Sequence, residues 1–417
     1  MTDFAAPRQY ESQAQSGRGD SRASGEGDDG KQGLWMTMSR AMLAMTLLVA
    51  ACGGETLDIG REPTDGTGGA TGDPSNDSGA PGGPTNSTVI VSPERTIRDL
   101  ALYDEHLYWV ALGSGDSTLE RCRPTDCQNT TEVLGRLVSG YTFLGRDLYM
   151  IALDPGSSPQ TSSLVSCPLH DCASPKKVAT ITKPSSVLVD DSGIYWSTNF
   201  DTSIYACPLA GCDAPARTVV DGFFSLGYLA SDERHLYYLV ETANGGPHDL
   251  ASVLKDGSAP PVVIAKSLKN PTRIRVRDGF VYWSSVGPQG YVARCPLRGC
   301  VNAEPEILAG KQRYPLSVEP EGDSIFWLNE NAGTLAGSTT PATIQSCKIA
   351  SCANDVAVID SAKGPASWLN LGSNSTTQLL VADADAIYYV GDQKGRDFDG
   401  GVPRFVDYAI RRLPRNR

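Results

Sequence analysis

Ten of the eleven cysteines in this sequence form five pairs with one spacing, in which four residues separate the two thiols. The pairs are Cys122 and Cys127, Cys167 and Cys172, Cys207 and Cys212, Cys295 and Cys300, and Cys347 and Cys352. Disulfide formation and metal binding are the two chemistries that suit such a pattern. Zinc sites bring together two C-x2-C pairs, whereas these wider pairs lie some 40 to 88 residues apart. We therefore predict five disulfides and no metal site.

The eleventh cysteine, Cys52, stands apart and follows an apolar stretch, residues 41–51, that Arg40 precedes. The stretch is too short to span a bilayer but fits the apolar region of a secretory signal. It ends in the letters LVAAC, which resemble the signal of bacterial lipoproteins. The resemblance implies cleavage before Cys52, acylation of this residue and attachment to the outer membrane of a bacterial envelope, with the exported chain in the periplasm or at the surface. A plain signal peptide with an incidental cysteine is the alternative.

The two flanks of this stretch differ in character. Residues 1–35 carry six acidic and four basic residues, whereas a signal begins with a short basic lead. We therefore predict that translation starts at Met36 or Met38, that the signal occupies 36–51, and that 1–35 is otherwise a disordered extension. Residues 53–86 are rich in Gly, Pro, Thr and Ser, so 52–86 is predicted to be the lipidated cysteine with a disordered tether of about 30 Å mean reach.

No familiar catalytic motif occurs in the sequence, which lacks G-x-S-x-G, H-E-x-x-H and P-loop patterns. The four histidines, His106, His170, His235 and His248, are interpreted as solvated turn residues rather than a catalytic set. Residues 397–400 (DFDG) resemble part of a calcium loop, but the ligands that should follow are absent. The sequence thus predicts no catalytic residue, no cofactor and no metal ion.

The elements that hold the paired cysteines repeat seven times along the chain. Each copy has an apolar run, an acidic turn, a second run with a central aromatic residue, a polar loop and a third run. The central aromatic residues are Tyr108, Tyr149, Tyr195, Tyr237, Tyr282, Phe326 and Tyr388. They lie 41, 46, 42, 45, 44 and 62 residues apart. A period in the forties with short β-rich runs is typical of a β-propeller.

Each copy supplies four strands, but only six copies have a fourth strand after the third. Residues 88–91 (TVIV), which precede the first copy, supply the seventh. We therefore predict an all-β fold over residues 87–417, a seven-bladed propeller of four-stranded antiparallel blades. Pairing of 89–91 with 408–412 inside one blade would close the ring and leave no open sheet edge there. The cysteine pairs staple the turns between third and fourth strands.

The repeat resembles the YWTD-type blades of low-density-lipoprotein-receptor relatives and of bacterial surface propellers. Residues 194–198 (IYWST) and 254–257 (LKDG) carry this likeness. Together with the C-P-L-x-G-C hairpins and the lipoprotein-like signal, the chain looks like the exported propellers of myxobacteria and their relatives. The resemblance implies a fold and a location, and it implies no reaction.

One face of the predicted ring gathers the loops between second and third strands and the loops that join successive copies. These loops are polar and differ in length, which is typical of a ligand-binding face on a rigid scaffold. The residues predicted to contact a ligand there are Arg95, Asp154, Lys183, Asp201, Glu241, Lys269, Lys311, Arg313, Asn329, Glu330 and Asp392. The longest insertions, 328–342 and 390–404, are the segments predicted to contact a partner.

We expect a non-catalytic binding protein, anchored to the cell envelope by lipid alone, whose partner is an envelope or extracellular protein or a glycan. The net charge of -12 opposes a nucleic-acid or anionic-lipid partner. One alternative is a lactonase- or lyase-like enzyme with a metal over the axis, which three or more converging carboxylates or amides would favour. A second is a structural subunit of an envelope assembly, which a large apolar patch on one face would favour.

The lipid anchor predicts that Cys52→Ser moves the protein from the membrane fraction to the soluble fraction of cells. The reason is that two or more acyl chains hold a protein on a bilayer through about 0.8 kcal/mol for each buried methylene. Fractionation followed by mass spectrometry of the N-terminal peptide measures both the location and the acyl group. A variant that stays with the membranes would refute the anchor.

Overall fold

The computed structural model describes residues 87–92, 95–113, 116–154, 156, 161–182, 184–198, 203–212, 216–222, 229–241, 243, 246–300, 302, 304–330, 342–361, 378–392, 398–399, 402–403 and 408–415. The chain divides into the units Met1–Asn76 and Asp77–Arg417, and every described residue belongs to the second. The predicted signal, Cys52 and the tether lie outside the described residues. Among the described residues, no helix is long and apolar enough to cross a lipid bilayer.

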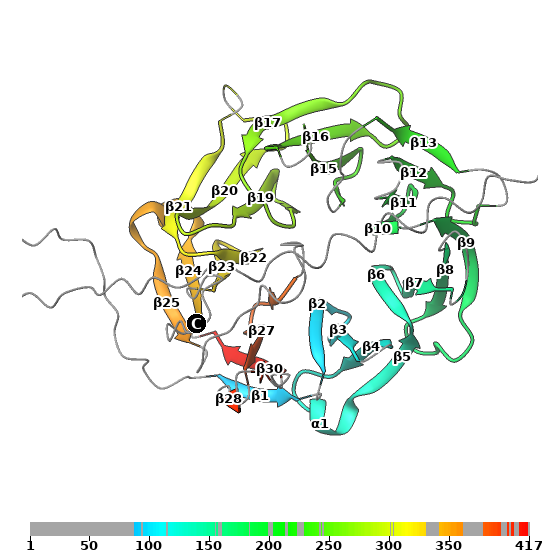
Figure 1. Ribbon diagram of the computed structural model, residues 1–417, viewed down its shortest axis with the longest axis horizontal. Coiled ribbons are helices and arrows are strands. Elements are labelled where there is room, and N and C mark those ends of the chain that lie inside the picture. Colours follow the sequence, from blue (N-terminus) through cyan, green and yellow to red (C-terminus); the bar gives the residue numbers. More distant parts are fainter. Residues whose placement is uncertain are drawn as a thin grey trace, which may run out of the picture. The chain divides into compact units, whose positions relative to one another are not determined.

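Seven antiparallel sheets of four strands stand side by side in a ring, which confirms the predicted propeller (Figure 1). Blade 1 comprises β2 (Thr96–Tyr103), β3 (His106–Leu112), β4 (Ser117–Cys122) and β5 (Glu132–Arg136). Blade 2 comprises β6 (Val138–Leu144), β7 (Asp147–Leu153), β8 (Thr161–Pro168) and β9 (Lys176–Thr182). Blade 3 comprises β10 (Pro184–Asp190), β11 (Gly193–Thr198), β12 (Ile204–Cys207) and β13 (Arg217–Val220).

The remaining blades follow the same order. Blade 4 comprises β14 (Ala230–Ser231), β15 (His235–Glu241), β16 (His248–Leu254) and β17 (Val262–Leu268). Blade 5 comprises β18 (Arg275–Arg277), β19 (Phe280–Ser285), β20 (Gly290–Pro296) and β21 (Glu306–Gln312). Blade 6 comprises β22 (Pro315–Glu321), β23 (Ser324–Asn329), β24 (Thr343–Lys348) and β25 (Ala357–Ser361).

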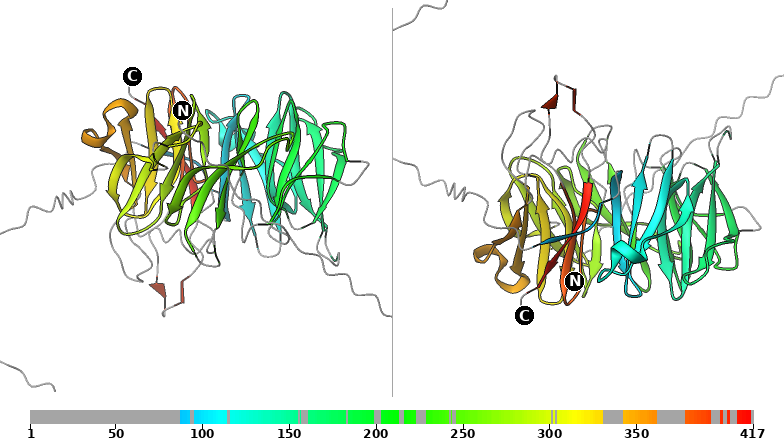
Figure 2. Two further views of the ribbon diagram at one scale, coloured as in Figure 1. Left: turned by 90° about the horizontal axis from the view of Figure 1, so that it is seen from above. Right: turned by 90° about the horizontal axis from the view of Figure 1, so that it is seen from below.

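Blade 7 closes the ring as predicted, because its outermost strand comes from the other end of the folded chain. It comprises β26 (Leu380–Ala382), β27 (Ala386–Asp392), β30 (Tyr408–Pro414) and β1 (Thr88–Val91). The register pairs Thr88 with Arg412 and Val91 with Ile410 in antiparallel fashion. A small hairpin, β28 (Phe398–Asp399) and β29 (Val402–Pro403), projects from one face of the ring (Figure 2). It belongs to the insertion between the second and third strands, so it marks the face on which those loops lie.

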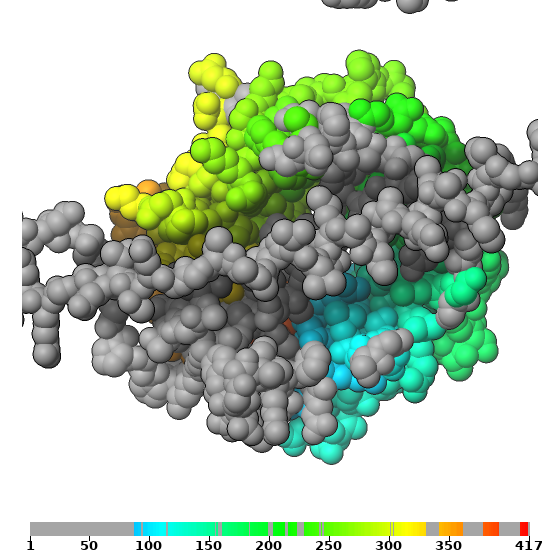
Figure 3. All heavy atoms as spheres, viewed as in Figure 1, coloured from blue at the N-terminus to red at the C-terminus, as the bar shows by residue number. Residues whose placement is uncertain are grey.

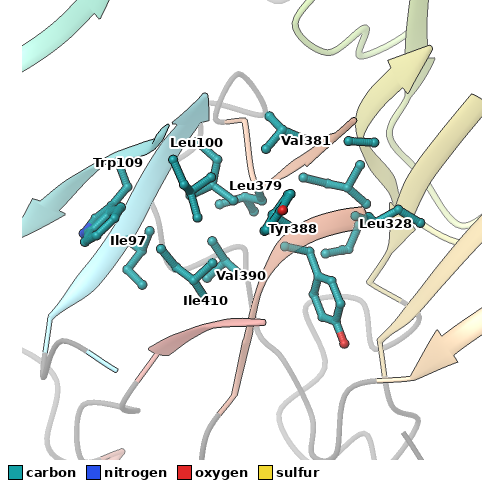
Figure 4. Close-up of a cluster of buried hydrophobic side chains, with 14 of the residues drawn as sticks. Ile97, Leu100, Trp109, Leu328, Leu379, Val381, Tyr388, Val390 and Ile410 are labelled. Carbon is teal, nitrogen blue, oxygen red and sulfur yellow. The ribbon is translucent and has the colours of Figure 1, made fainter. Parts of the chain in front are cut away.

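The aromatic second strands form the cores between blades, where apolar side chains contribute roughly 25 cal/mol for each Å² removed from water. Trp109, Trp283 and Trp327 are fully buried. One cluster joins blades 1, 6 and 7, with Ile97 and Leu328 at its two sides (Figure 4). In the space-filling view, blades 4 and 5 form a continuous green-to-yellow surface (Figure 3). The seven central aromatic residues of the repeat are at most 7% exposed, so they are packing residues.

The cysteine hairpins are confirmed as disulfides, with Cα atoms 4.9 to 5.6 Å apart, inside the range that a disulfide spans. Each stapled turn also contacts the preceding blade. The Cys212 amide donates to the Val178 carbonyl of blade 2, and the Cys300 amide donates to the Ile264 carbonyl of blade 4. In the first and sixth copies the turns form α1 (Cys127–Thr130) and η2 (Ile349–Asn354). The staples thus hold turns that link neighbouring blades.

Blade 4 lacks a cysteine pair and uses charged groups for the same link. Arg217 of blade 3 donates to the Lys255 carbonyl at 2.7 Å and to the Asp256 carbonyl at 3.0 Å. The Lys255 ammonium, only 8% exposed, forms an ion pair with Asp190 of blade 3. Burial alone would raise the pKa of Asp190, but hydrogen bonds from Lys255 and Ser192 outweigh it and hold this pKa below 3.8.

We predict that Lys255→Met lowers the free energy of unfolding by about 2 kcal/mol at neutral pH, because it leaves a partly buried carboxylate without its cation. Because the folded pKa of Asp190 is depressed, the ion pair stabilises fully above the unfolded value of 3.8 and is lost as pH falls through the folded value. The deficit of the variant should therefore shrink below about pH 4. Urea unfolding across pH measures it, with the exposed Lys266→Met as control; an equal deficit at all pH values would contradict the assignment.

Candidate binding site in the axial channel

The first strand of each blade lies nearest the axis of the ring (Figure 1). Four of these strands, β2, β6, β10 and β22, contain a register shift near their beginnings. At two of the shifts, Asp99 and Ser317 adopt the left-handed backbone, with φ of 54° and 53°. Such bulges turn a side chain out of the regular alternation of a strand. The innermost strands are thus bent so that polar side chains share the channel with apolar ones.

Five charged side chains converge on the axis from three blades. Arg273 of blade 5 lies 3.3 Å from Asp99 of blade 1, and this ion pair spans the ring between blades that are not neighbours. Arg98 approaches the other oxygen of Asp99 at 3.6 Å. Arg275 lies 3.1 Å from Glu319 of blade 6. Three guanidinium groups thus meet two carboxylates, which leaves one excess positive charge inside a chain of net charge -12.

Burial makes these charges costly. It lowers the pKa of Arg275 and raises the pKa of Glu319, and the attraction between the two groups opposes both shifts. The Tyr141 hydroxyl donates to the Asp99 carbonyl, and burial, then the charge of Asp99, raises the pKa of Tyr141 well above 10.0. Buried ion pairs seldom add net stability, since desolvation offsets their attraction. Charges in such a position are therefore candidates for function.

A cavity of about 150 Å³ lies against this cluster. Its lining residues are Asp99, Leu100, Ala101, Ser139, Gly140, Tyr141, Thr142, Phe143, Ile151, Ser185, Ser186, Val187, Arg273 and Arg275. They include two arginines and one aspartate, side chains with hydroxyl groups, and apolar side chains. Arg273 precedes β18, and Ser185 and Ser186 lie at the start of β10, so the cavity reaches the end of the channel that receives the loops joining successive blades. We call these lining residues the axial site.

A larger groove of about 400 Å³ lies at the rim, where β1 meets α1. Glu120 is the charged residue of its lining. The axial site is the better candidate, because charged groups from several blades converge on it. Within the described residues, no three His, Cys, Asp or Glu side chains gather as a metal site.

The residues that the sequence predicted as ligand contacts lie in several separate parts of the structure, where the structure describes them. Arg95 forms an ion pair with Asp116 at 3.2 Å, and Asp154 accepts hydrogen bonds from Thr161 and Ser163 of β8. The remaining predicted contacts fall into three groups: Glu241 ends β15, and Lys269, Lys311 and Arg313 are exposed; Asn329 and Glu330 are buried; Lys183, Asp201 and the side chain of Asp392 lie outside the described residues.

Asn329 and Glu330 occupy a structural junction between blades 5 and 6. The Asn329 amide donates to Gln312 at 2.8 Å, and Trp327 donates to the same oxygen at 3.2 Å. The Glu330 backbone amide donates to the Tyr314 carbonyl. Both residues are at most 2% exposed, and the Asn329 side chain and the Glu330 backbone amide hold the link between β21 and β22.

Sequence reasoning missed the axial residues, although it chose the face to which the cavity leads. One signal was available: charged residues interrupt the first apolar run of three copies, at Arg98 and Asp99, at Arg273 and Arg275, and at Glu319. In a strand that faces the axis, such charges must point into the channel or be paired. Ligand contacts were predicted in the loops instead, because polar loops are where such contacts are usually found.

No protein-family model matches the chain, and none of the curated proteins matches it. Among solved structures it is similar to a prolyl endopeptidase, with 12% identity and a TM-score of 0.50 over 77% of this chain and 50% of that chain. It is also similar to a chain of a nidogen/laminin complex (15% identity, TM-score 0.41, 60% and 92% covered) and to TolB from Acinetobacter baumannii (11%, 0.38, 51% and 57%). The chain thus spans half the length of the endopeptidase, and this likeness shows the fold alone, that of a β-propeller.

We predict that Arg275→Gln destabilises the ring more than Arg273→Gln. Arg275→Gln leaves Glu319, which is 16% exposed, without its cation and should cost about 3 kcal/mol. Arg273→Gln should cost about 1 kcal/mol, because Arg98 still lies beside Asp99 and this carboxylate keeps one cation. Chemical denaturation of both variants tests the order. The reverse order would show that the pair spanning the axis is the main support of the channel.

Proposed function

We propose that this protein is a non-catalytic binding protein of the bacterial cell envelope, anchored through a lipid on Cys52, whose axial site binds a protein partner. The observation that carries the proposal is the convergence of Arg273 and Arg275 on one cavity of about 150 Å³. Guanidinium groups held by a rigid scaffold bind carboxylates and other planar anions through paired hydrogen bonds. A partner that presents an anionic group is therefore the ligand class that fits.

The charges at the axis favour binding over a metal-dependent reaction. Among the described residues, the carboxylates that pair with the axial arginines are Asp99 and Glu319. A calcium ion takes six to eight oxygen ligands, and adjacent guanidinium groups repel it. The same arginines provide a local positive potential within an acidic protein, which attracts anions to the channel.

The wall of the cavity favours a protein over a glycan. Leu100, Phe143, Ile151 and Val187 are among its lining residues. Sugar rings carry hydroxyl groups that would lose hydrogen bonds against such a wall. A peptide side chain can bury apolar area there instead.

The location rests on the sequence. The letters LVAAC before Gly53, and the polar segment 53–86, support an acylated cysteine followed by a spacer. Such a spacer would hold the ring about 30 Å from the lipid surface, within reach of envelope proteins.

The large apolar side chains that are exposed among the described residues lie along the rim, including Val133, Val262, Ile307 and Val358.

The test is capture of partners from envelope extract by the full chain, kept soluble by Cys52→Ser, with and without chelator. We expect a protein to be retained by this chain and by the control Arg294→Gln, whose ion pair with Glu306 lies on the outer strands. Arg273→Gln should lower its recovery about tenfold, since removing one partner of a charged contact costs at least 1.4 kcal/mol. Recovery that is equal with Arg273→Gln, recovery of a glycan, or loss on chelation would each reject the proposal.

A further inference from the structure

The axial site combines two kinds of surface within one small volume. Arg273 and Arg275 provide its cationic groups, and Phe143, Ile151 and Val187 provide apolar side chains. A cavity of about 150 Å³ is smaller than the ~300–1,000 Å³ pockets that hold drug-sized molecules. In other proteins a void of this volume takes up one benzene molecule. The site is therefore the size of one amino-acid residue.

We propose that the axial site binds the C-terminal residue of a partner polypeptide, with the terminal carboxylate on Arg273 and Arg275 and an apolar side chain against Phe143 and Ile151. This inference rests on the proposed function and names the part of the partner that the site recognises. A C-terminal residue carries its carboxylate and its side chain on the same carbon atom. It thus presents an anion and an apolar group together, which is the combination that the lining offers.

The geometry of the charged groups favours a carboxylate. Guanidinium groups match the two oxygens of a carboxylate in a planar, paired arrangement. The lining arginines belong to the cluster of three arginines and two carboxylates, which carries one excess positive charge beside the cavity. One carboxylate neutralises that excess, whereas a phosphate dianion would overcompensate it. Ser139 and Ser185 also line the cavity, and the Ser185 hydroxyl shares a hydrogen bond with the Ser197 hydroxyl.

The ion pair between Arg273 and Asp99 favours a chain end over a segment in the middle of a chain. It spans the channel from blade 5 to blade 1, and Tyr141 donates to the carbonyl of Asp99 beside it. A chain that continued through the channel would have to displace this pair. A chain end stops at the pair and leaves it in place.

The apolar wall selects the kind of terminal residue. Burying one medium-sized apolar side chain contributes about 1.5–3 kcal/mol. Terminal carboxylates are recognised elsewhere by cradles of hydrogen-bond donors next to a side-chain pocket, so the combination has a physical precedent. A free small acid with an apolar body shares this chemistry, and the experiment separates the two sources.

The experiment measures binding of short synthetic probes to the full chain carrying Cys52→Ser by calorimetry or ligand-observed NMR. The probes are acetyl-Gly-Gly-Leu with a free carboxylate, the same peptide as its amide, acetyl-Gly-Glu-Gly-amide and acetyl-leucine. We expect the free carboxylate to bind about tenfold or more tightly than the amide and the internal glutamate. Arg273→Gln should remove that advantage, and the control Arg294→Gln should keep it.

Each outcome decides a separate point. Tighter binding of the peptide than of acetyl-leucine assigns the site to a chain end, and equal binding assigns the same carboxylate site to a free small acid. Equal binding of peptide and amide, or no binding of any probe at millimolar concentration, overturns the inference. If envelope capture still depends on Arg273 in that case, the proposed function stands and only the C-terminal residue is rejected. If capture does not depend on Arg273, the proposed function fails as well.

Discussion

The pairing of β1 with β30 is the constraint on which the rest of the structure depends. The ring is closed by hydrogen bonds between its first and last strands, since an open blade would expose unpaired amides and carbonyls. The register that joins Thr88 to Arg412 connects residues more than 300 positions apart. Ser87 adds a hydrogen bond to Tyr389 of the same blade. This contact between the two ends of the folded chain completes the four strands of blade 7.

Closure alone does not hold neighbouring blades at a fixed angle, and the turns between third and fourth strands supply that support. Cys212 and Cys300 donate from stapled turns to the blade before them. Arg217 and Lys255 make the equivalent link where the staple is absent. A disulfide that closes so short a loop contributes at most a few kcal/mol through chain entropy. The disulfide also shapes a turn that contacts the preceding blade.

The fold was predictable because each of its determinants is repeated. The seven central aromatic residues, from Tyr108 to Tyr388, fix the second strands, and the cysteine spacing fixes five turns. The axial site has no such repetition. Asp99 and Arg273 are 174 residues apart, and Asp99 faces the axis because a bulge turns its backbone to φ 54°. The spacing of residues along a sequence does not indicate which side chains meet across a ring, so this pair could not be predicted.

The axial charges are not the arrangement that would give the ring its greatest stability. Apolar side chains of similar volume in place of a buried ion pair often leave a protein as stable or more so. Here burial lowers the pKa of Arg275 and raises the pKa of Glu319, so it opposes the charged form of both groups. The closing strands and the stapled turns supply stability at the rim, far from the axis. That separation allows the innermost strands to carry bulges and charges, so the channel can hold a recognition site without opening the ring.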